Sequence, residues 1–320
     1  MSLVAETPLA RPTSPARTDP EVLSRSRVAV WAYSCAVVAG LILLDVFGEL
    51  SYLIASSLLA LAAFAAIALA YRSRTALIHL RVDRTDLSMV AITYVAVVVL
   101  YRIAFQVIEG QDMLLFLFFA LGMMAGVAGP VVYTVWGRRR ALATLGLSTS
   151  NLPRIAILAL IFAAVQFSVT FWGYDGLPGI KDVITLGAMA LVVGVFESIF
   201  FRGFIQGRLQ ESFGVAPAVF GAAVLYGAYH VGYGMGFEEI VFLCGLGIIY
   251  ALAYATTENI LIMWPLLTPL GSLFAQFEGG DLVGRLPWAA LLGWADVAAL
   301  MIALLVIARR HERKLSLKAV

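Results

Sequence analysis

Charged residues are scarce in this chain. Of its 320 residues, 13% are charged and 62% are hydrophobic, whereas soluble domains usually carry about 25% charged residues. This composition excludes a soluble globular fold. The net charge of +2 says nothing in itself about nucleic acid, and no nucleic-acid partner is expected.

Cysteine and histidine are also scarce. Cys35 and Cys244 both lie in apolar runs, so a disulfide framework is not expected. Of the three histidines, His79 and His311 fall in a loop and in the C-terminal tail, and His230 alone is embedded. Zinc takes three or four ligands, commonly with His-Glu-x-x-His spacing on one helix. The sequence lacks such a set, and no metal or organic cofactor is expected.

Long apolar runs make up most of the chain. A helix needs about 20 apolar residues to span a bilayer, and the sequence predicts ten such helices: 28–47, 51–71, 87–108, 112–136, 153–173, 182–204, 216–232, 238–255, 259–277 and 288–308. The predicted fold is an all-α, polytopic transmembrane helical bundle whose partner is the lipid bilayer.

The lysines and arginines of the predicted loops are distributed unequally, which indicates orientation. One side collects most of them: Arg11, Arg17, Arg25, Arg27, Arg72, Arg74, Arg81, Arg84, Arg138, Arg139, Arg140, Arg208, Arg309, Arg310, Arg313, Lys314 and Lys318. Both termini are therefore predicted to be cytoplasmic. The high ratio of arginine to lysine points to a bacterial protein, and a bacterial cytoplasmic membrane is the expected location.

Four regions are predicted along the chain. Residues 1–27 are polar, rich in Pro, Ser and Arg, and lack the apolar core of a signal peptide, so they are expected to form a disordered cytoplasmic tail. Residues 28–137 hold the N-terminal transmembrane helices. Residues 138–280 form the core, and residues 281–320 hold the last span and a basic cytoplasmic tail.

Five ionisable residues lie inside predicted spans, where such residues are costly and mark functional sites by default: Arg102, Glu197, Arg202, His230 and Asp296. Arg102 and Asp296 have no assignable partner and are predicted to make structural pairs between helices. Arg202 is five positions from Glu197, so it is expected on a different helix face, one turn from Ser198. Its alternative role is that of an interfacial residue whose charge reaches the membrane surface.

Glu197 and His230 form the sharpest constellation. They are equidistant from a turn near Gly214, so an antiparallel helical hairpin would place them at the same depth, about 25 Å along each helix. That depth is near mid-membrane, toward the cytoplasmic side. A carboxylate beside an imidazole can hold and deprotonate a water molecule. The alternative is a buried hydrogen bond that only joins two helices, and spacing alone does not separate these interpretations.

Two motifs around these residues resemble the CPBP family, which comprises the CAAX prenyl proteases and the bacteriocin-processing (Abi) intramembrane proteases. The family motif Glu-Glu-x-x-x-Arg reads Glu197-Ser198-Ile199-Phe200-Phe201-Arg202 here. The family motif Phe-x-x-x-His reads Tyr226-Gly227-Ala228-Tyr229-His230. A basic stretch, Arg138-Arg139-Arg140, followed by Leu145-Gly146-Leu147, is a further family habit. The resemblance covers roughly residues 138–277.

The chain departs from the family pattern at two places. Ser198 replaces the second glutamate of the first motif. The family's third motif has a histidine and, four residues later, Asn or Asp; the candidate positions here are Thr268 and Ser272, or Pro269 and Leu273. The resemblance implies that Glu197 and His230 activate water while the usual oxyanion donors are missing, and the hydroxyls of Thr268 and Ser272 are candidate substitutes.

The resemblance implies a glutamate-type intramembrane endopeptidase that cleaves a membrane-associated peptide or protein. Glu197 would be the general base, His230 would orient the water, and Arg202 would position the motif helix or the substrate terminus. Ser198, Tyr226, Thr268 and Ser272 are weaker candidates for substrate or oxyanion contacts. Two other interpretations remain: a pseudoprotease that binds and regulates a membrane partner without cleavage, and a transporter whose path uses the embedded ionisable residues.

Overall fold

The computed structural model describes residues 82–108, 110–149, 152–170, 180–279 and 289–318, and the secondary structure of these residues is helical throughout. The predicted N-terminal tail and the first two predicted spans lie outside the described residues. The first five elements are α3 (Arg84–Arg102), η1 (Ile103–Val107), α4 (Asp112–Val132), η2 (Tyr133–Gly137) and η3 (Leu142–Leu145). The central elements are α5 (Leu152–Thr170), α6 (Ile180–Glu197), η4 (Ser198–Gln206), α7 (Gly207–Phe213), α8 (Val215–Ala228) and η5 (Tyr229–Tyr233). The chain continues with α9 (Phe237–Thr257), η6 (Ile260–Ile262), α10 (Leu267–Gly279) and α11 (Ala289–Lys318).

Six helical segments among the described residues are long and apolar enough to cross a membrane: Arg84–Val107, Asp112–Gly137, Val183–Phe213, Val215–Tyr233, Phe237–Ala255 and Leu291–Leu315. The chain is therefore an all-helical integral membrane protein, as predicted. In a bilayer, helices satisfy their own backbone hydrogen bonds. Side chains such as Ile92, Leu117, Ile157, Phe220 and Leu292 are exposed on the outside of the bundle, where lipid can cover them.

The predicted span at 259–277 is not one continuous helix. The short 3-10 helix η6 is followed by a turn that contains a cis Trp264–Pro265 peptide bond, and α10 begins at Leu267. Pro265 lies before α10 and Pro269 lies in its first turn, where a missing N–H costs the helix no hydrogen bond. The prolines therefore mark the start of a 13-residue helix rather than a kink inside a long one.

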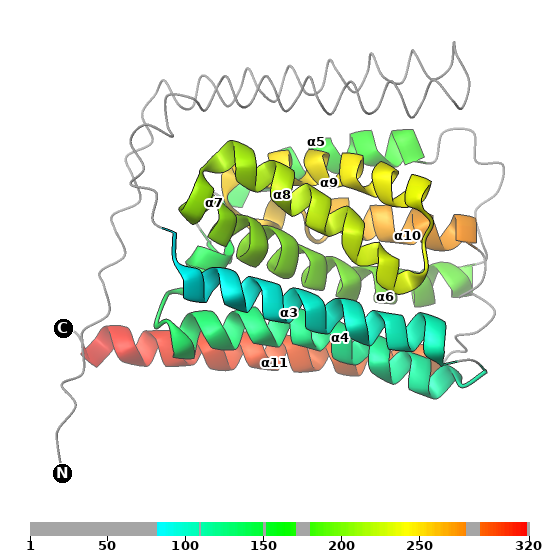
Figure 1. The fold of residues 1–320 in the computed structure, drawn as a ribbon, viewed down its shortest axis with the longest axis horizontal. Coiled ribbons are helices and arrows are strands. Elements are labelled where there is room, and N and C mark those ends of the chain that lie inside the picture. The colour runs from blue at the N-terminus through cyan, green and yellow to red at the C-terminus, as the bar shows by residue number, and fades with distance from the viewer. Residues whose placement is uncertain (1–81, 109, 150–151, 171–179, 280–288, 319–320) are drawn as a thin grey trace.

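The helices are arranged around α6 (Figure 1). Helices α3, α4 and α11 lie along one side of it, and α8, α9, α5 and α10 lie along the other. Direct contacts join α6 to α4, α10 and α11, while α8 and α9 form an antiparallel hairpin with an extensive contact. The α6–η4–α7 segment thus runs through the middle of the bundle, and it carries the first motif.

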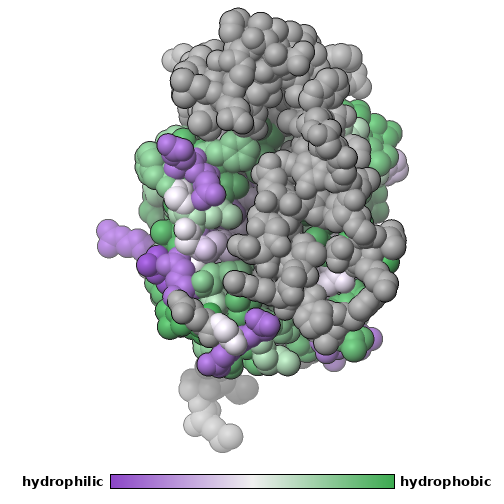
Figure 2. All heavy atoms as spheres, turned by 90° about the vertical axis from the view of Figure 1, so that its right-hand side faces the viewer, coloured by the Kyte–Doolittle hydropathy of each residue, from purple (hydrophilic) through white to green (hydrophobic). Residues whose placement is uncertain are grey.

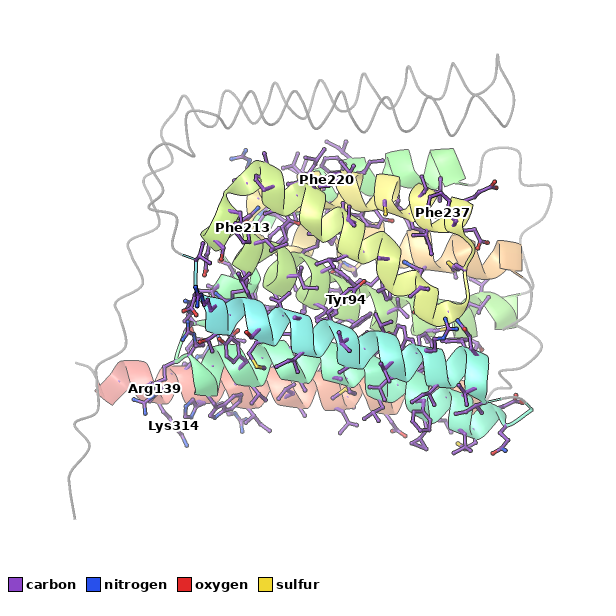
Figure 3. All side chains as sticks on the ribbon, in the orientation of Figure 1. Tyr94, Arg139, Phe213, Phe220, Phe237 and Lys314 are labelled. Atoms are coloured by element: carbon purple, nitrogen blue, oxygen red, sulfur yellow. The ribbon has the colours of Figure 1, made fainter. Side chains whose placement is uncertain are left out.

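The arginine-rich end of the bundle is held together by a buried carboxylate. Asp86, which is 2% exposed, accepts a hydrogen bond from the Tyr133 hydroxyl at 2.5 Å and pairs with Arg138 at 3.0 Å and Arg140 at 3.3 Å. The buried Arg208 guanidinium lies 4.0 Å from the same carboxylate. These contacts join the beginning of α3, the end of α4 and the beginning of α7. Arg139 and Lys314 both lie at this end (Figure 3).

The opposite end carries the α3–α4 and α8–α9 connections. It is seen end-on in Figure 2, where hydrophilic (purple) side chains lie beside hydrophobic (green) ones. Helix α9 begins here with Glu238 and Glu239 in its first turn, and the Glu239 carboxylate accepts a hydrogen bond from the Gly236 N–H at 2.7 Å. Negative charge is favourable at the beginning of a helix, and α9 begins within one residue of the predicted span 238–255.

Candidate active site

Glu197 is the last residue of α6 and is buried, with 4% of its surface exposed. It lies near the middle of the membrane-spanning segment Val183–Phe213. Directly after it, residues Ser198–Gln206 form a π-helix. Stretches of π-helix are rare and occur frequently at functional sites, so the helix type itself marks this position.

Two tyrosine hydroxyls from the facing helix contact the Glu197 carboxyl group. The Tyr229 hydroxyl donates to Oε1 at 2.5 Å, and the Tyr226 hydroxyl donates to Oε2 at 3.4 Å. Helix α8 ends at Ala228, and residues 229–233 continue as a 3-10 helix. In a 3-10 helix residues three apart lie above one another, and this change of helix type brings Tyr226 and Tyr229 to the same side.

His230 lies in the same 3-10 turn and is buried. Its Nδ1 is 2.9 Å from the Tyr226 carbonyl oxygen. Because a carbonyl oxygen can only accept, Nδ1 carries the proton, and in the neutral ring Nε2 is left with its lone pair. The His230 ring lies 4.0 Å from the Tyr229 ring, centroid to centroid. Among the described residues Glu197 and His230 share no direct hydrogen bond, and Tyr229 lies against both.

The predicted hairpin is present in the structure. Gly214 adopts a φ of +87° at the turn between α7 and α8, and the first and second motifs face each other across it. His230, however, is three residues from the end of η5 at Tyr233. Glu197 thus lies near the middle of its span, whereas His230 lies close to the end of its own span.

Arg202 is brought toward Glu197 by the π-helix. In an α-helix residues five apart point in different directions, but a π-helix bonds residue i to i+5, which turns Arg202 back to the side of Glu197. Arg202 lies over the Tyr226 ring, and the hydroxyl of the same tyrosine donates to Glu197, so both side chains reach one residue. The prediction of a different helix face is therefore wrong, and so is the alternative of an interfacial residue, because Arg202 is 1% exposed.

The Arg202 guanidinium has an unusual environment. It lies over the Tyr226 ring at 5.1 Å and near the Tyr250 ring at 6.0 Å. Neither terminal nitrogen has a hydrogen-bond partner within the part of the chain that the structure describes. A buried charge normally needs a partner, so aromatic faces supply most of the contact that a carboxylate would give.

The two departures from the family motifs meet in space. The Ser198 hydroxyl lies 3.4 Å from the Thr268 hydroxyl, and both residues are buried. Thr268 also donates to the Met263 carbonyl oxygen at 3.2 Å. Ser272 lies one turn further along α10 and is partly exposed. Ser198, at the position of the second glutamate, is thus in contact with Thr268, one of the two candidate third-motif positions.

Helix α3 supports the second motif from outside the region of family resemblance. The Tyr94 hydroxyl donates to the Leu225 carbonyl oxygen at 2.9 Å, and the Gln106 amide donates to the carbonyl oxygens of Val231 and Gly232. These bonds lie on either side of Tyr226–His230, and Tyr94 is seen facing the bundle in Figure 3. The N-terminal helices therefore fix the turn that carries His230.

Two of the embedded ionisable residues are not in the site. Arg102 and Asp296 are both exposed on the outside of the bundle. Neither makes the predicted interhelical pair with any residue that the structure describes. Arg102 ends α3 and Asp296 is in the second turn of α11, so both lie toward helix ends, where charged side chains can reach the interface. The described residues also contain no group of three or more His, Cys, Asp or Glu that could hold a metal ion.

Sequence reasoning missed Tyr229, Tyr233 and Tyr250, which line the site with Tyr226. The Tyr233 ring stacks on the His230 ring at 5.4 Å. The available signal was the spacing of Tyr226, Tyr229 and Tyr233, which follows one helix face. A row of tyrosines at this spacing more often belongs to a packed core. The predicted pair of Glu197 and His230 also gave no reason to expect that tyrosine hydroxyls would donate hydrogen bonds to the carboxyl group.

The comparisons with known proteins agree with the motifs. Residues 179–266 match the family model described as Rce1-like, type II CAAX prenyl endopeptidase. The matched segment contains both motifs and ends before Thr268, so the third-motif position lies outside it. Searches of curated proteins and of solved structures gave no match. The resemblance to the CPBP family of CAAX-type proteases is therefore confirmed for residues 179–266, the helical core of this membrane protein.

Proposed function

We propose that this protein is an intramembrane glutamate-type endopeptidase that cleaves a membrane-associated peptide or protein. The observation that carries the proposal is that the buried Glu197 carboxyl group contacts the helical turn that contains His230. The first motif continues from Glu197 as a π-helix, and the His230 turn is a 3-10 helix. The match to a CAAX prenyl endopeptidase model supports the same reaction class. No metal or organic cofactor is part of the proposed mechanism.

The proposed reaction uses one water molecule between Glu197 and His230. The His230 Nε2 lone pair accepts one hydrogen of the water and orients it. Glu197 takes the other proton as the water oxygen attacks the peptide carbonyl carbon. The carbonyl oxygen becomes an oxyanion, the carbon–nitrogen bond breaks, and the proton held by Glu197 passes to the leaving amine. Both side chains return to their starting state.

The oxyanion would be stabilised by neutral hydroxyls in place of the family's usual donors. Ser198 directly follows Glu197, and its buried hydroxyl can turn toward the oxyanion, while Thr268, whose proton is donated to the Met263 carbonyl oxygen, supports Ser198. Donors that are already oriented toward developing charge contribute about 10²–10³ in rate each. Ser272 is partly exposed, and its proposed contribution is smaller than that of Thr268.

The proposed setting is a bacterial cytoplasmic membrane, with ten spans and both termini in the cytoplasm. The uneven distribution of arginine supports this orientation. Residues 138–280 would form the catalytic core, residues 28–137 the supporting N-terminal helices, residues 1–27 a cytoplasmic tail, and residues 281–320 the last span and basic tail. The contacts of Tyr94 and Gln106 with the second motif support a bracing role for α3.

A cleavage assay tests the proposal. The purified protein is reconstituted in liposomes with a library of membrane-anchored peptides, and products are identified by mass spectrometry. We expect cleavage by the parent and none by Glu197→Gln or His230→Ala, with the double variant no worse than either single one, because residues that share one water act as a unit. Cleavage that persists in Glu197→Gln would overturn the assignment. A parent that binds peptides without cleaving them would instead identify a pseudoprotease.

A further inference from the structure

The two oxygens of the Glu197 carboxyl group are not equivalent. Oε1 receives a short hydrogen bond from the Tyr229 hydroxyl at 2.5 Å, whereas Oε2 receives a long one from the Tyr226 hydroxyl at 3.4 Å. Hydrogen bonds weaken as this distance grows. One oxygen is therefore firmly engaged, and the other keeps most of its capacity to accept a proton.

The Tyr229 side chain is itself held rigidly. It is buried, and its ring contacts Phe201 at 4.7 Å and His230 at 4.0 Å between centroids. Tyr229 is also the first residue of η5, and the Gln106 amide donates a hydrogen bond to the Val231 carbonyl oxygen further along this helix. A hydroxyl fixed in this way sets the direction of the carboxyl group that it contacts.

We propose that Tyr229 is a positioning residue, which engages Glu197 Oε1 and thereby presents Oε2 as the basic oxygen toward His230. The proposal rests on the proposed function. Tyr229 touches neither water nor substrate in this role, and it acts through Glu197. His230 follows Tyr229 directly in the sequence. One helical turn therefore carries both Tyr229, which orients the base, and His230, which orients the water.

The first test is the Tyr229→Phe variant, which removes one hydroxyl and leaves the ring. Losing a hydrogen bond to a charged group corresponds to roughly a 10- to 100-fold effect. We expect kcat to fall by about that factor while KM changes by less than about threefold, because Tyr229 does not contact substrate. The acid limb of the pH–rate profile should also move. In a Glu197→Gln background, Tyr229→Phe should cost nothing further.

Tyr101→Phe is the matched control. Tyr101 is equally buried and its ring lies 6.0 Å from that of Tyr229, but no hydrogen bond joins its hydroxyl to Glu197. We expect this variant to keep the kcat and the pH profile of the parent. Equal losses in the two variants, accompanied by equal falls in melting temperature, would overturn the proposal and leave the tyrosines a packing role.

A measurement that needs no activity separates the proposal from the proposed function. The infrared band of the Glu197 carboxyl group is assigned as the difference between the parent and Glu197→Gln. This band should shift in Tyr229→Phe and stay in place in Tyr101→Phe. A shift in a protein that cleaves nothing would uphold the positioning role and reject the protease function. A band that does not respond to Tyr229→Phe would reject the positioning role.

Discussion

Arg202 shows how a single residue in this protein opposes stability. Its guanidinium is buried against Tyr226 and Tyr250, and its terminal nitrogens lack hydrogen-bond partners among the described residues. A buried cation of this kind costs more in lost hydration than aromatic faces return. Residues that lower the stability of the fold in this way are typical of functional sites, where activity rather than stability determines which amino acid is present.

Replacing Arg202 with methionine should therefore separate stability from activity. Arg202→Met keeps the length of the side chain and removes the charge, and apolar replacements of buried charges are often neutral or stabilising by about 1–4 kcal/mol. We expect an unchanged or higher melting temperature in detergent, together with cleavage reduced by up to about 10²-fold. Arg102→Met, at an exposed position, is the control for both measurements. A strongly lowered melting temperature in Arg202→Met would show that Arg202 has a structural partner.

The helices that carry the motifs show what could and could not be predicted from the sequence. Glu197 and His230 were identified correctly as facing residues, because depth in a hairpin depends only on the distance from the turn. Arg202 was placed on the wrong face, because the prediction assumed α-helical periodicity where residues 198–206 form a π-helix. Tyr229 was missed, because the change to 3-10 geometry at residue 229 leaves no clear signal in the sequence.

The outer helices show the same division. The boundaries of α3, α4 and α9 follow from apolar length and from acids at helix beginnings. The broken span before α10 was predicted as continuous, because hydropathy does not register the turn at Trp264–Pro265. Arg102 and Asp296 were expected to pair across helices. Both are exposed instead, because each lies on the outward face of its helix, and the mean hydropathy of a span does not show which face points outward.

The close contact between η4 and η3 leads to a prediction about the packing of these two helices. A Cβ atom on Gly203 would overlap the carbonyl group of Leu145, so the two backbones must separate in Gly203→Ala. Overpacking of this kind costs about 1–3 kcal/mol, and we expect a melting temperature lowered by several degrees. Gly187→Ala in α6 meets nothing within 4 Å and should be neutral or stabilising by about 0.5–1 kcal/mol. Comparable melting of the two variants would show that η3 yields without cost.

At the scale of the whole molecule, the two ends of the bundle differ in charge and in what they hold. The arginine-rich end contains the buried Asp86 with Arg138, Arg140 and Arg208 around it. The other end carries the acidic beginning of α9 and lies closer to His230. A positively charged end is expected to face the cytoplasm, so the acidic beginning of α9 is expected on the outer side.

Single-cysteine labelling tests this orientation. In a Cys35→Ala, Cys244→Ala background, Gln111→Cys and Glu238→Cys report the acidic end, and Arg139→Cys and Lys314→Cys report the basic end; all four positions are exposed. We expect a membrane-impermeant maleimide added to intact cells to label the first pair. The second pair should be labelled only after the cells are lysed. Labelling of Arg139→Cys in intact cells would invert the proposed topology.

The π-helix at Ser198–Gln206 also limits how this protein can change in length. One residue fewer in that stretch would remove the wide turn and return it toward α-helical winding, which changes the face on which each of its side chains lies. Glu197 would keep its place, but Arg202 would turn away from the Tyr226 ring, over which it now lies. Single-residue deletions should therefore be tolerated in the exposed loops and eliminated here.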